Sequence, residues 1–124
     1  MSNRITRLSS FDLSNLRLER LRSPFHFGGL VILDGRALLD DRGRLRLEEI
    51  RSRLNRRLAR LPELRRRVYF PGLLRGRALW VDDDGFDIQK HALEAAVDPP
   101  GGELQLLDTA ARLYGSLLDR SRPL

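Results

Sequence analysis

The sequence predicts a single mixed α/β domain, and its size, composition and hydrophobic pattern all point that way. The chain has 124 residues, the usual size of one domain, and 41% of them are hydrophobic, which is enough for a core. Charged residues make up 32%, but they are mixed in sign, so the composition does not force disorder. One long segment repeats apolar residues at helical spacing, and several short apolar runs bounded by turn residues are typical of strands.

The first predicted element is a helix over residues 10–21. Ser9 and Asp12 have the S-x-x-D spacing of a capping box, and the acid falls near the positive end of the helix dipole. Pro24 closes the segment. The predicted buried side consists of leucines at helical spacing: Leu13, Leu16 and Leu21.

Residues 25–33 (FHFGGLVIL) predict a buried strand that ends at a turn formed by Asp34 and Gly35. The adjacent glycines Gly28 and Gly29 indicate a bulge or a close approach of another group to the backbone. His26 lies in the same run. A single histidine on a strand more often has a structural role than a catalytic one, so a structural role is the favoured interpretation.

The clearest helix is predicted over residues 47–61, after a turn at residues 40–43. Its apolar stripe consists of Leu47, Ile50, Leu54, Leu58 and Leu61. Acids occupy the first turn and arginines follow towards the end, as the helix dipole favours. The polar face is rich in arginine, which fits either a solvated surface or contact with an anionic membrane surface.

Two short strands are predicted next, over residues 67–70 and 78–81, followed by an acidic turn at residues 82–85. The three aspartates of this turn lack the full spacing and the bidentate glutamate of an EF-hand loop. We therefore predict a solvated turn and assign no metal ligand.

The last third of the chain begins with an ambiguous segment, residues 86–97, for which intrinsic propensity favours a helix. A loop at residues 98–102 leads to a final helix over residues 103–118. The predicted buried positions of that helix are Leu106, Ala110, Leu113 and Leu117.

Charge is distributed unevenly along the chain. Residues 1–77 carry a net charge of +11, and residues 78–124 carry −5. A basic half fits a nucleic acid, an anionic lipid or simply a solvated arginine-rich surface. Because no aromatic residues interrupt the basic region 42–67, as a base-stacking surface would need, we expect no specific nucleic-acid binding, only weak and salt-sensitive association.

Several classes of site and of targeting segment are absent from the sequence. There is no cysteine, which excludes a disulfide framework, a thiolate zinc site and a cysteine nucleophile. The apolar runs are too short to span a bilayer, and the N-terminus has no apolar signal core.

Several short motifs occur in a fixed order along the chain. They are L-S-x-x-D from Leu8, Glu19 on the first helix, P-x-H-x-G-G-L from Pro24, P-x-L-R-R-R from Pro62, W-V-D-D from Trp80, F-D-x-x-x-H from Phe86 to His91, and L-D-R-S-R-P-L from Leu118. Together, in this order and spacing, they resemble the bacterial wax ester synthase/diacylglycerol acyltransferase family. The resemblance covers essentially the whole chain.

The resemblance implies a fold as well as a function. The family has two halves that resemble chloramphenicol acetyltransferase, with the active site between them. Residues 1–124 are expected to form the N-terminal portion of such a domain, with a mixed sheet and flanking helices. The resemblance also favours a strand over residues 86–97, where propensity favours a helix.

The family's catalytic motif is H-H-x-x-x-D-G, whose second histidine is the general base for the acceptor hydroxyl. The two histidines of this chain, His26 and His91, are not adjacent, and neither is followed by D-G at that spacing. We therefore assign no catalytic residue. The chain is expected to end before the motif and to be inactive alone.

The resemblance implies acyl-CoA as co-substrate, no tightly bound cofactor, and diacylglycerol or a long-chain alcohol as acceptor. The expected partner is the remainder of the acyltransferase polypeptide. The expected location is the cytoplasm, including the inner face of the membrane or the surface of a lipid droplet. Two alternatives remain open: a small arginine-rich nucleic-acid-binding or interaction module, and a structural or regulatory protein derived from a truncated acyltransferase.

Overall fold

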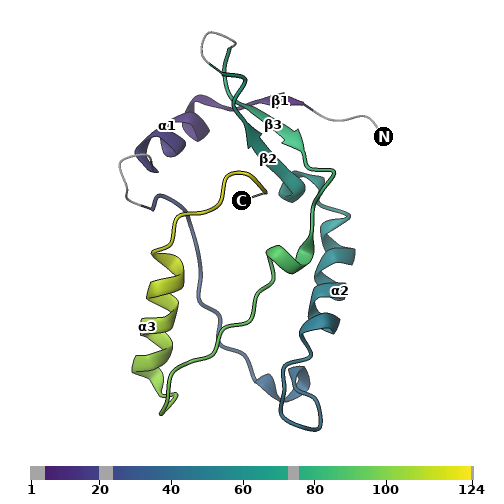
Figure 1. Ribbon diagram of the computed structural model, residues 1–124, viewed down its shortest axis with the longest axis vertical. Coiled ribbons are helices and arrows are strands. Elements are labelled where there is room, and N and C mark those ends of the chain that lie inside the picture. The colour runs from purple at the N-terminus through teal and green to yellow at the C-terminus, as the bar shows by residue number, and fades with distance from the viewer. Residues whose placement is uncertain (1–4, 20–23, 73–75, 124) are drawn as a thin grey trace. The chain divides into compact units, whose positions relative to one another are not determined.

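The computed structural model describes residues 5–19, 24–72 and 76–123. The chain divides into two compact units: unit 1 comprises Met1–Phe27, Leu61–Phe86 and Gly115–Leu124, and unit 2 comprises Gly28–Arg60 and Asp87–Tyr114. The described residues form three α-helices and a small three-stranded sheet (Figure 1), so the predicted mixed α/β class is confirmed.

The sheet belongs to unit 1 and is antiparallel throughout the described residues, so the predicted mixed sheet is wrong for this part of the chain. Its strands are β1 (Thr6–Arg7), β2 (Arg66–Tyr69) and β3 (Leu79–Asp82), with β3 in the centre. The structure confirms the two predicted strands, each displaced by one residue. The two-residue β1 is too short to show a periodicity and was not predicted.

The core of unit 1 lies between this sheet and α1 (Ser10–Glu19). Leu8, Val68 and Ala78 are its buried hydrophobic side chains, and Leu13, Leu16 and Trp80 pack against them. Val68 lies opposite Trp80 in the β2–β3 ladder, so the two share the core face of the sheet. The predicted buried side of the first helix is confirmed for Leu13 and Leu16, whereas Leu21 lies outside the described residues.

The predicted capping box is confirmed at the start of α1. The backbone N–H of Ser9 donates to Oδ2 of Asp12 (3.0 Å), and the backbone N–H of Asp12 donates to Oγ of Ser9 (3.1 Å). These reciprocal bonds satisfy two backbone donors that the helix itself leaves without partners.

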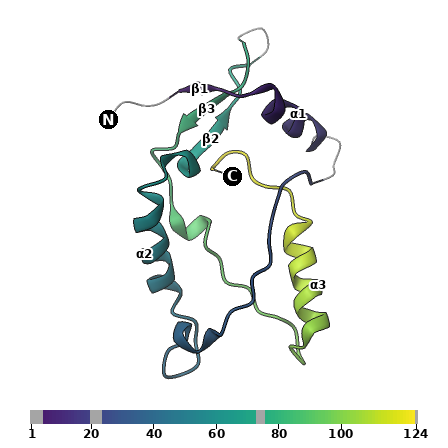
Figure 2. The same cartoon turned by 180° about the vertical axis from the view of Figure 1, so that it is seen from behind.

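Unit 2 contains α2 (Leu47–Leu58) and α3 (Glu103–Tyr114). Both predicted helices are confirmed, but they end three and four residues earlier than expected. A short 3-10 helix at Ile88–Lys90 lies beside α2 in both views (Figures 1 and 2), and Nε of Arg51 donates to the carbonyl oxygen of Ala92 (3.0 Å). This bond joins α2 to the segment after the 3-10 helix.

The apolar stripes of α2 and α3 are less buried than their spacing predicts. In the described part of unit 2, the one buried residue is Thr109. Leu54 and Leu113 are exposed, as is Leu117, which follows the end of α3. Spacing shows which side of a helix is apolar, but burial also requires a neighbouring element to cover that side.

The predicted strand over residues 25–33 is wrong. Residues 24–34 form no strand, and the described part of the chain offers them no strand partner. The side chains of residues 30–33 are between 52% and 76% exposed. An apolar run indicates a segment that gains from burial, but a strand also needs a neighbour for its backbone hydrogen bonds.

Residues 86–97 form neither the predicted helix nor the predicted strand. Ile88–Lys90 is a single 3-10 turn, and an irregular segment follows. The side chain of Asp87 accepts a hydrogen bond from the backbone N–H of Gln89 (3.0 Å). This local bond favours a capped turn over a continuous element.

The predicted turns and the predicted loop are confirmed. Oδ1 of Asp40 accepts hydrogen bonds from the backbone N–H groups of Arg42 and Arg44, both at 2.9 Å, and Gly43 adopts a φ of 73°. The acidic turn begins one residue later than predicted, because Asp82 is the last residue of β3. Residues 98–102 form a loop before α3.

Candidate functional site

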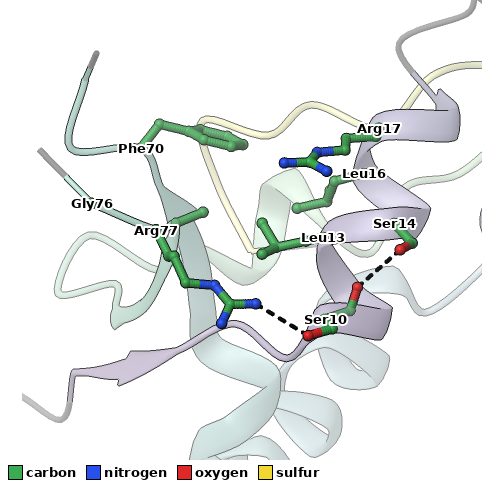
Figure 3. A pocket seen from close by; sticks show the side chains of 9 residues that line it. Ser10, Leu13, Ser14, Leu16, Arg17, Phe70, Gly76 and Arg77 are labelled. Atoms are coloured by element: carbon green, nitrogen blue, oxygen red, sulfur yellow. Dashed lines mark hydrogen bonds between the residues drawn. The ribbon is translucent and has the colours of Figure 1, made fainter. Parts of the chain in front are cut away.

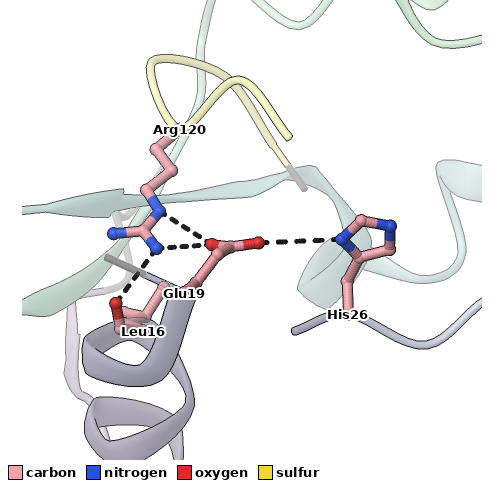
Figure 4. Close-up of polar contacts among 4 residues, drawn as sticks. All are labelled: Leu16, Glu19, His26 and Arg120. Atoms are coloured by element: carbon pink, nitrogen blue, oxygen red, sulfur yellow. Dashed lines mark hydrogen bonds and ion pairs between the residues drawn. The ribbon is translucent and has the colours of Figure 1, made fainter. Parts of the chain in front are cut away.

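The most buried charge cluster in the described chain joins three segments that are far apart in sequence (Figure 4). Glu19, at the end of α1, is 8% exposed. Arg120 donates to Oε2 of Glu19 from Nε (3.1 Å) and from Nη2, and Nη2 also donates to the carbonyl oxygen of Leu16 (3.0 Å). On the other side, Nδ1 of His26 lies 3.6 Å from Oε1 of Glu19.

The cluster keeps Glu19 ionised. Burial alone raises the pKa of a carboxyl group, because it penalises the charged form. Here the hydrogen bond and positive charge of Arg120, with contributions from His26 and the backbone of Phe25, outweigh burial and hold the pKa of Glu19 below its ordinary value. Glu19 is therefore a fixed negative charge and a poor proton acceptor at neutral pH.

Arg120 also anchors the end of the described chain. Its two bonds to α1 span 101 and 104 residues of sequence, and Pro123, three residues later, is buried. Glu19 and His26 belong to motifs noted in the sequence, and Arg120 lies within L-D-R-S-R-P-L. The structure therefore brings three motif segments to one ion-paired cluster, a geometry that no sequence spacing indicated.

A second set of contacts explains the P-x-L-R-R-R and W-V-D-D motifs. Arg65, Arg66 and Arg67 are consecutive, and each contacts a residue at or after the end of β3. The contacts are Arg65 Cζ over the ring of Phe86 (4.7 Å), Arg66 Nε with Asp82 Oδ1 (3.3 Å), and Arg67 Nε with Asp83 Oδ1 (4.0 Å). These three contacts and the β2–β3 ladder hold the two motifs together.

The two histidines belong to different units of the chain, and neither lies in an H-H-x-x-x-D-G motif. His26 contacts Glu19 in unit 1, and His91 ends the 3-10 turn of unit 2. The contact of His26 with a buried ion pair supports the structural role favoured for it. The residues described here also hold no group of three or more histidine, aspartate or glutamate side chains arranged to bind a metal ion.

Two of the four arginines of α2 pair with acids on the same helix. Nη1 of Arg51 lies 2.6 Å from Oε1 of Glu48, and Nη2 of Arg53 lies 2.6 Å from Oε1 of Glu49. Outside α2, Arg44 pairs with Asp40 in the preceding turn. These local pairs reduce the positive potential that a nucleic-acid backbone would meet on this region.

Comparison with known proteins adds a result that the geometry alone does not give. The family model of the wax ester synthase/diacylglycerol acyltransferase catalytic domain matches residues 8–124. The chain belongs to this family. The family resemblance of the sequence motifs is therefore confirmed, and the two contact networks described above join residues of those motifs.

Among the relatives of this wax ester synthase/diacylglycerol acyltransferase chain are two mycobacterial proteins. The probable diacylglycerol O-acyltransferase tgs3 of Mycobacterium tuberculosis is 37% identical over 120 residues, which cover 97% of this chain and 42% of the relative. The probable diacylglycerol O-acyltransferase tgs2 of the same organism is 33% identical over 113 residues, which cover 91% of this chain and 24% of the relative. The chain thus spans less than half the length of either relative.

No solved structure gives a significant match to the chain. In the ranges that the structure describes, no helix combines the length and the apolar character needed to cross a membrane.

Proposed function

We propose that this chain is the N-terminal portion of a long-chain acyl-CoA:diacylglycerol or acyl-CoA:long-chain-alcohol O-acyltransferase, which makes triacylglycerol or wax esters. The observation that carries the proposal is the family match over residues 8–124. Relatives named as probable diacylglycerol O-acyltransferases, aligned over almost the whole chain, support it.

In this proposal the chain supplies walls and packing for the enzyme, and the base that deprotonates the acceptor hydroxyl lies elsewhere in the polypeptide. A general base must lie within hydrogen-bond reach of the proton that it removes. His26 is 14% exposed and contacts Glu19, and Glu19 is held ionised by Arg120. This cluster therefore suits a structural role. We propose that the complete enzyme has two halves that resemble chloramphenicol acetyltransferase, and that this chain supplies the first helices and strands of one half.

The exposed apolar surfaces support the presence of further polypeptide in the complete enzyme. Residues 30–33 are exposed in unit 2, and Phe27, just before them, is 90% exposed. In unit 1, Tyr69 and Leu79 form a pair on the face of the sheet opposite Val68. Removing apolar surface of this kind from water lowers the free energy. We propose that the remainder of the acyltransferase covers it.

A chimeric enzyme tests the proposal. The 120 aligned residues of tgs3 are replaced by this chain, and acyl transfer from long-chain acyl-CoA to diacylglycerol and to hexadecanol is measured. We expect the chimera to retain turnover and this chain alone to have none. A version of tgs3 that lacks the aligned residues is the negative control, and unaltered tgs3 is the reference.

Two outcomes would contradict the proposal. One is a folded chimera without activity beside an active tgs3. The other is turnover by this chain alone that disappears in His26→Ala or His91→Ala, because it would place the base inside these 124 residues.

A further inference from the structure

A cavity of about 460 Å³ lies within unit 1, between α1 and residues of the β2–β3 connection that adjoin the two strands (Figure 3). Its apolar wall is formed by Leu13, Leu16 and Ala78, with Phe70 at the opposite side. Leu13, Leu16 and Ala78 also belong to the core of unit 1, so the wall is a continuation of that core to the surface.

Two guanidinium groups, those of Arg17 and Arg77, line the same cavity. Nη2 of Arg77 donates to Oγ of Ser10 (3.2 Å), while Arg17 extends from α1 towards Phe70 (Figure 3). None of the described lining residues is an aspartate or glutamate, and neither arginine forms an ion pair with another described residue.

This arrangement differs from that of three other arginines in unit 1. Arg66, Arg67 and Arg120 each pair with a carboxylate. Arg17 and Arg77 retain donors that a carboxylate or phosphate could occupy. A guanidinium group binds such anions through two parallel N–H bonds, and an adjacent apolar wall accommodates a hydrocarbon chain.

We propose that the cavity binds an anionic amphiphile, with Arg17 and Arg77 on its phosphate or carboxylate group and with its hydrocarbon portion on the wall of Leu13, Leu16 and Ala78. The described residues that line the cavity all belong to unit 1. The proposal does not depend on acyl transfer, and the binding test below can succeed or fail whatever the chimera does.

The test is isothermal titration of the purified chain with four probes below their aggregation limits: dodecyl phosphate, laurate, dodecanol and inorganic phosphate. We expect saturable binding of dodecyl phosphate or laurate, weakened by added salt. Dodecanol lacks the charge and inorganic phosphate lacks the chain, so each should bind at least about tenfold more weakly. Whichever of dodecyl phosphate and laurate binds more tightly shows whether the site prefers a phosphate or a carboxylate.

Arg17→Ala and Arg77→Ala should each weaken binding about tenfold, because each removes a charge-assisted contact. Arg57→Ala is the matched control: it removes the same charge from an exposed arginine of α2, in unit 2. Arg17 is exposed, and its side chain forms no hydrogen bond or ion pair with another described residue, so its removal should leave the unfolding midpoint unchanged.

Three results would overturn the proposal. They are no saturable binding of either charged amphiphile by the folded chain, equal weakening by Arg57→Ala and Arg17→Ala, and dodecanol binding as tight as that of dodecyl phosphate. The second result would indicate attraction by net charge without a defined site.

Discussion

Unit 1 and unit 2 differ in how far their apolar side chains are buried. In unit 1 a helix packs on a sheet, and Leu8, Val68 and Ala78 are buried between them. In the described part of unit 2, the single buried residue is Thr109, while residues 30–33 are largely exposed. Unit 1 therefore contains a core of its own, whereas the described part of unit 2 buries none of its hydrophobic side chains to the same degree.

Breaking the buried Glu19–Arg120 ion pair of unit 1 should lower the free energy of unfolding far more than breaking an exposed ion pair of unit 2. We expect Arg120→Ala to lower the free energy of unfolding by about 3 kcal/mol, because it leaves Glu19 buried without its guanidinium partner. The measurement is denaturant unfolding followed by the fluorescence of Trp80, which is the single tryptophan and lies in unit 1.

The control for this prediction is Arg53→Ala, which breaks an exposed pair with Glu49 on α2 and should cost less than about 0.5 kcal/mol. Equal losses in the two variants would mean that the Glu19 cluster does not hold unit 1 together.

Truncation of one apolar residue in each unit tests the difference in burial between the units directly. Val68 is 4% exposed and Ile32 is 76% exposed. We expect Val68→Ala to lower the free energy of unfolding by about 2 kcal/mol and Ile32→Ala to lower it by less than about 0.5 kcal/mol. Chemical denaturation of both variants provides the comparison, and a large loss in Ile32→Ala would show that residues 30–33 are buried in solution.

The Glu19 cluster should also make the stability of unit 1 depend on pH. The pKa of Glu19 is below its ordinary value of 4.5 in the folded chain. Its stabilising contribution is therefore fully present above about pH 4.5 and is lost as the pH falls through the folded value. The slope for a single proton is at most about 1.4 kcal/mol per pH unit.

Glu19→Gln isolates this contribution, because other carboxylates, such as Asp40 and Asp119, also have lowered pKa values. We expect the difference in unfolding free energy between wild type and Glu19→Gln to shrink between pH 5 and pH 3. A difference that stays constant over this range would show that Glu19 has an unchanged pKa in the folded chain.

Two adjacent glycines of unit 2, Gly28 and Gly29, differ in the space around them. A Cβ atom added at Gly28 would lie 2.6 Å from the ring of Tyr114, whereas one added at Gly29 would have nothing within 4 Å. We expect Gly28→Ala to cost about 1 kcal/mol, because the ring must move, and Gly29→Ala to cost less. Thermal unfolding followed by circular dichroism compares the two, and equal midpoints would mean that Tyr114 does not pack on Gly28.

The substitution with the smallest expected effect on stability, Ile32→Lys, should instead change self-association. We expect the isolated chain to self-associate through its exposed apolar segment, and Ile32→Lys to reduce this without a change in the unfolding midpoint. Size-exclusion chromatography with light scattering measures the mass. A monodisperse wild-type monomer with one sharp transition well above about 60 °C would instead mean that these residues form a complete domain.

The sequence predicted the features whose cause is local. The capping box of Ser9 and Asp12 spans one helical turn, and the stripe of residues 47–58 repeats within a single helix. Both can be identified without knowledge of the rest of the fold. The close approach to the backbone at Gly28 was also indicated, although its partner Tyr114 was not.

The features that sequence analysis missed depend on distant partners. Glu19 was noted as a motif residue, but nothing in the sequence pairs it with Arg120, 101 residues away. The strand over residues 25–33 was predicted from its apolar character, which does not reveal whether a neighbouring strand is present. In the same way, the cavity of Arg17 and Arg77 combines residues that are 60 positions apart and share no motif.

The contacts of Arg65, Arg66 and Arg67 have a consequence for how homologous chains can vary. They align β2 with β3 at the end of the hairpin opposite its connecting segment, residues 70–78. Because register is fixed at that end, the connecting segment does not need a particular turn to bring Val68 opposite Trp80. We therefore expect insertions and deletions between Phe70 and Ala78 to leave the pairing of Val68 with Trp80, and the core face that they share, unchanged.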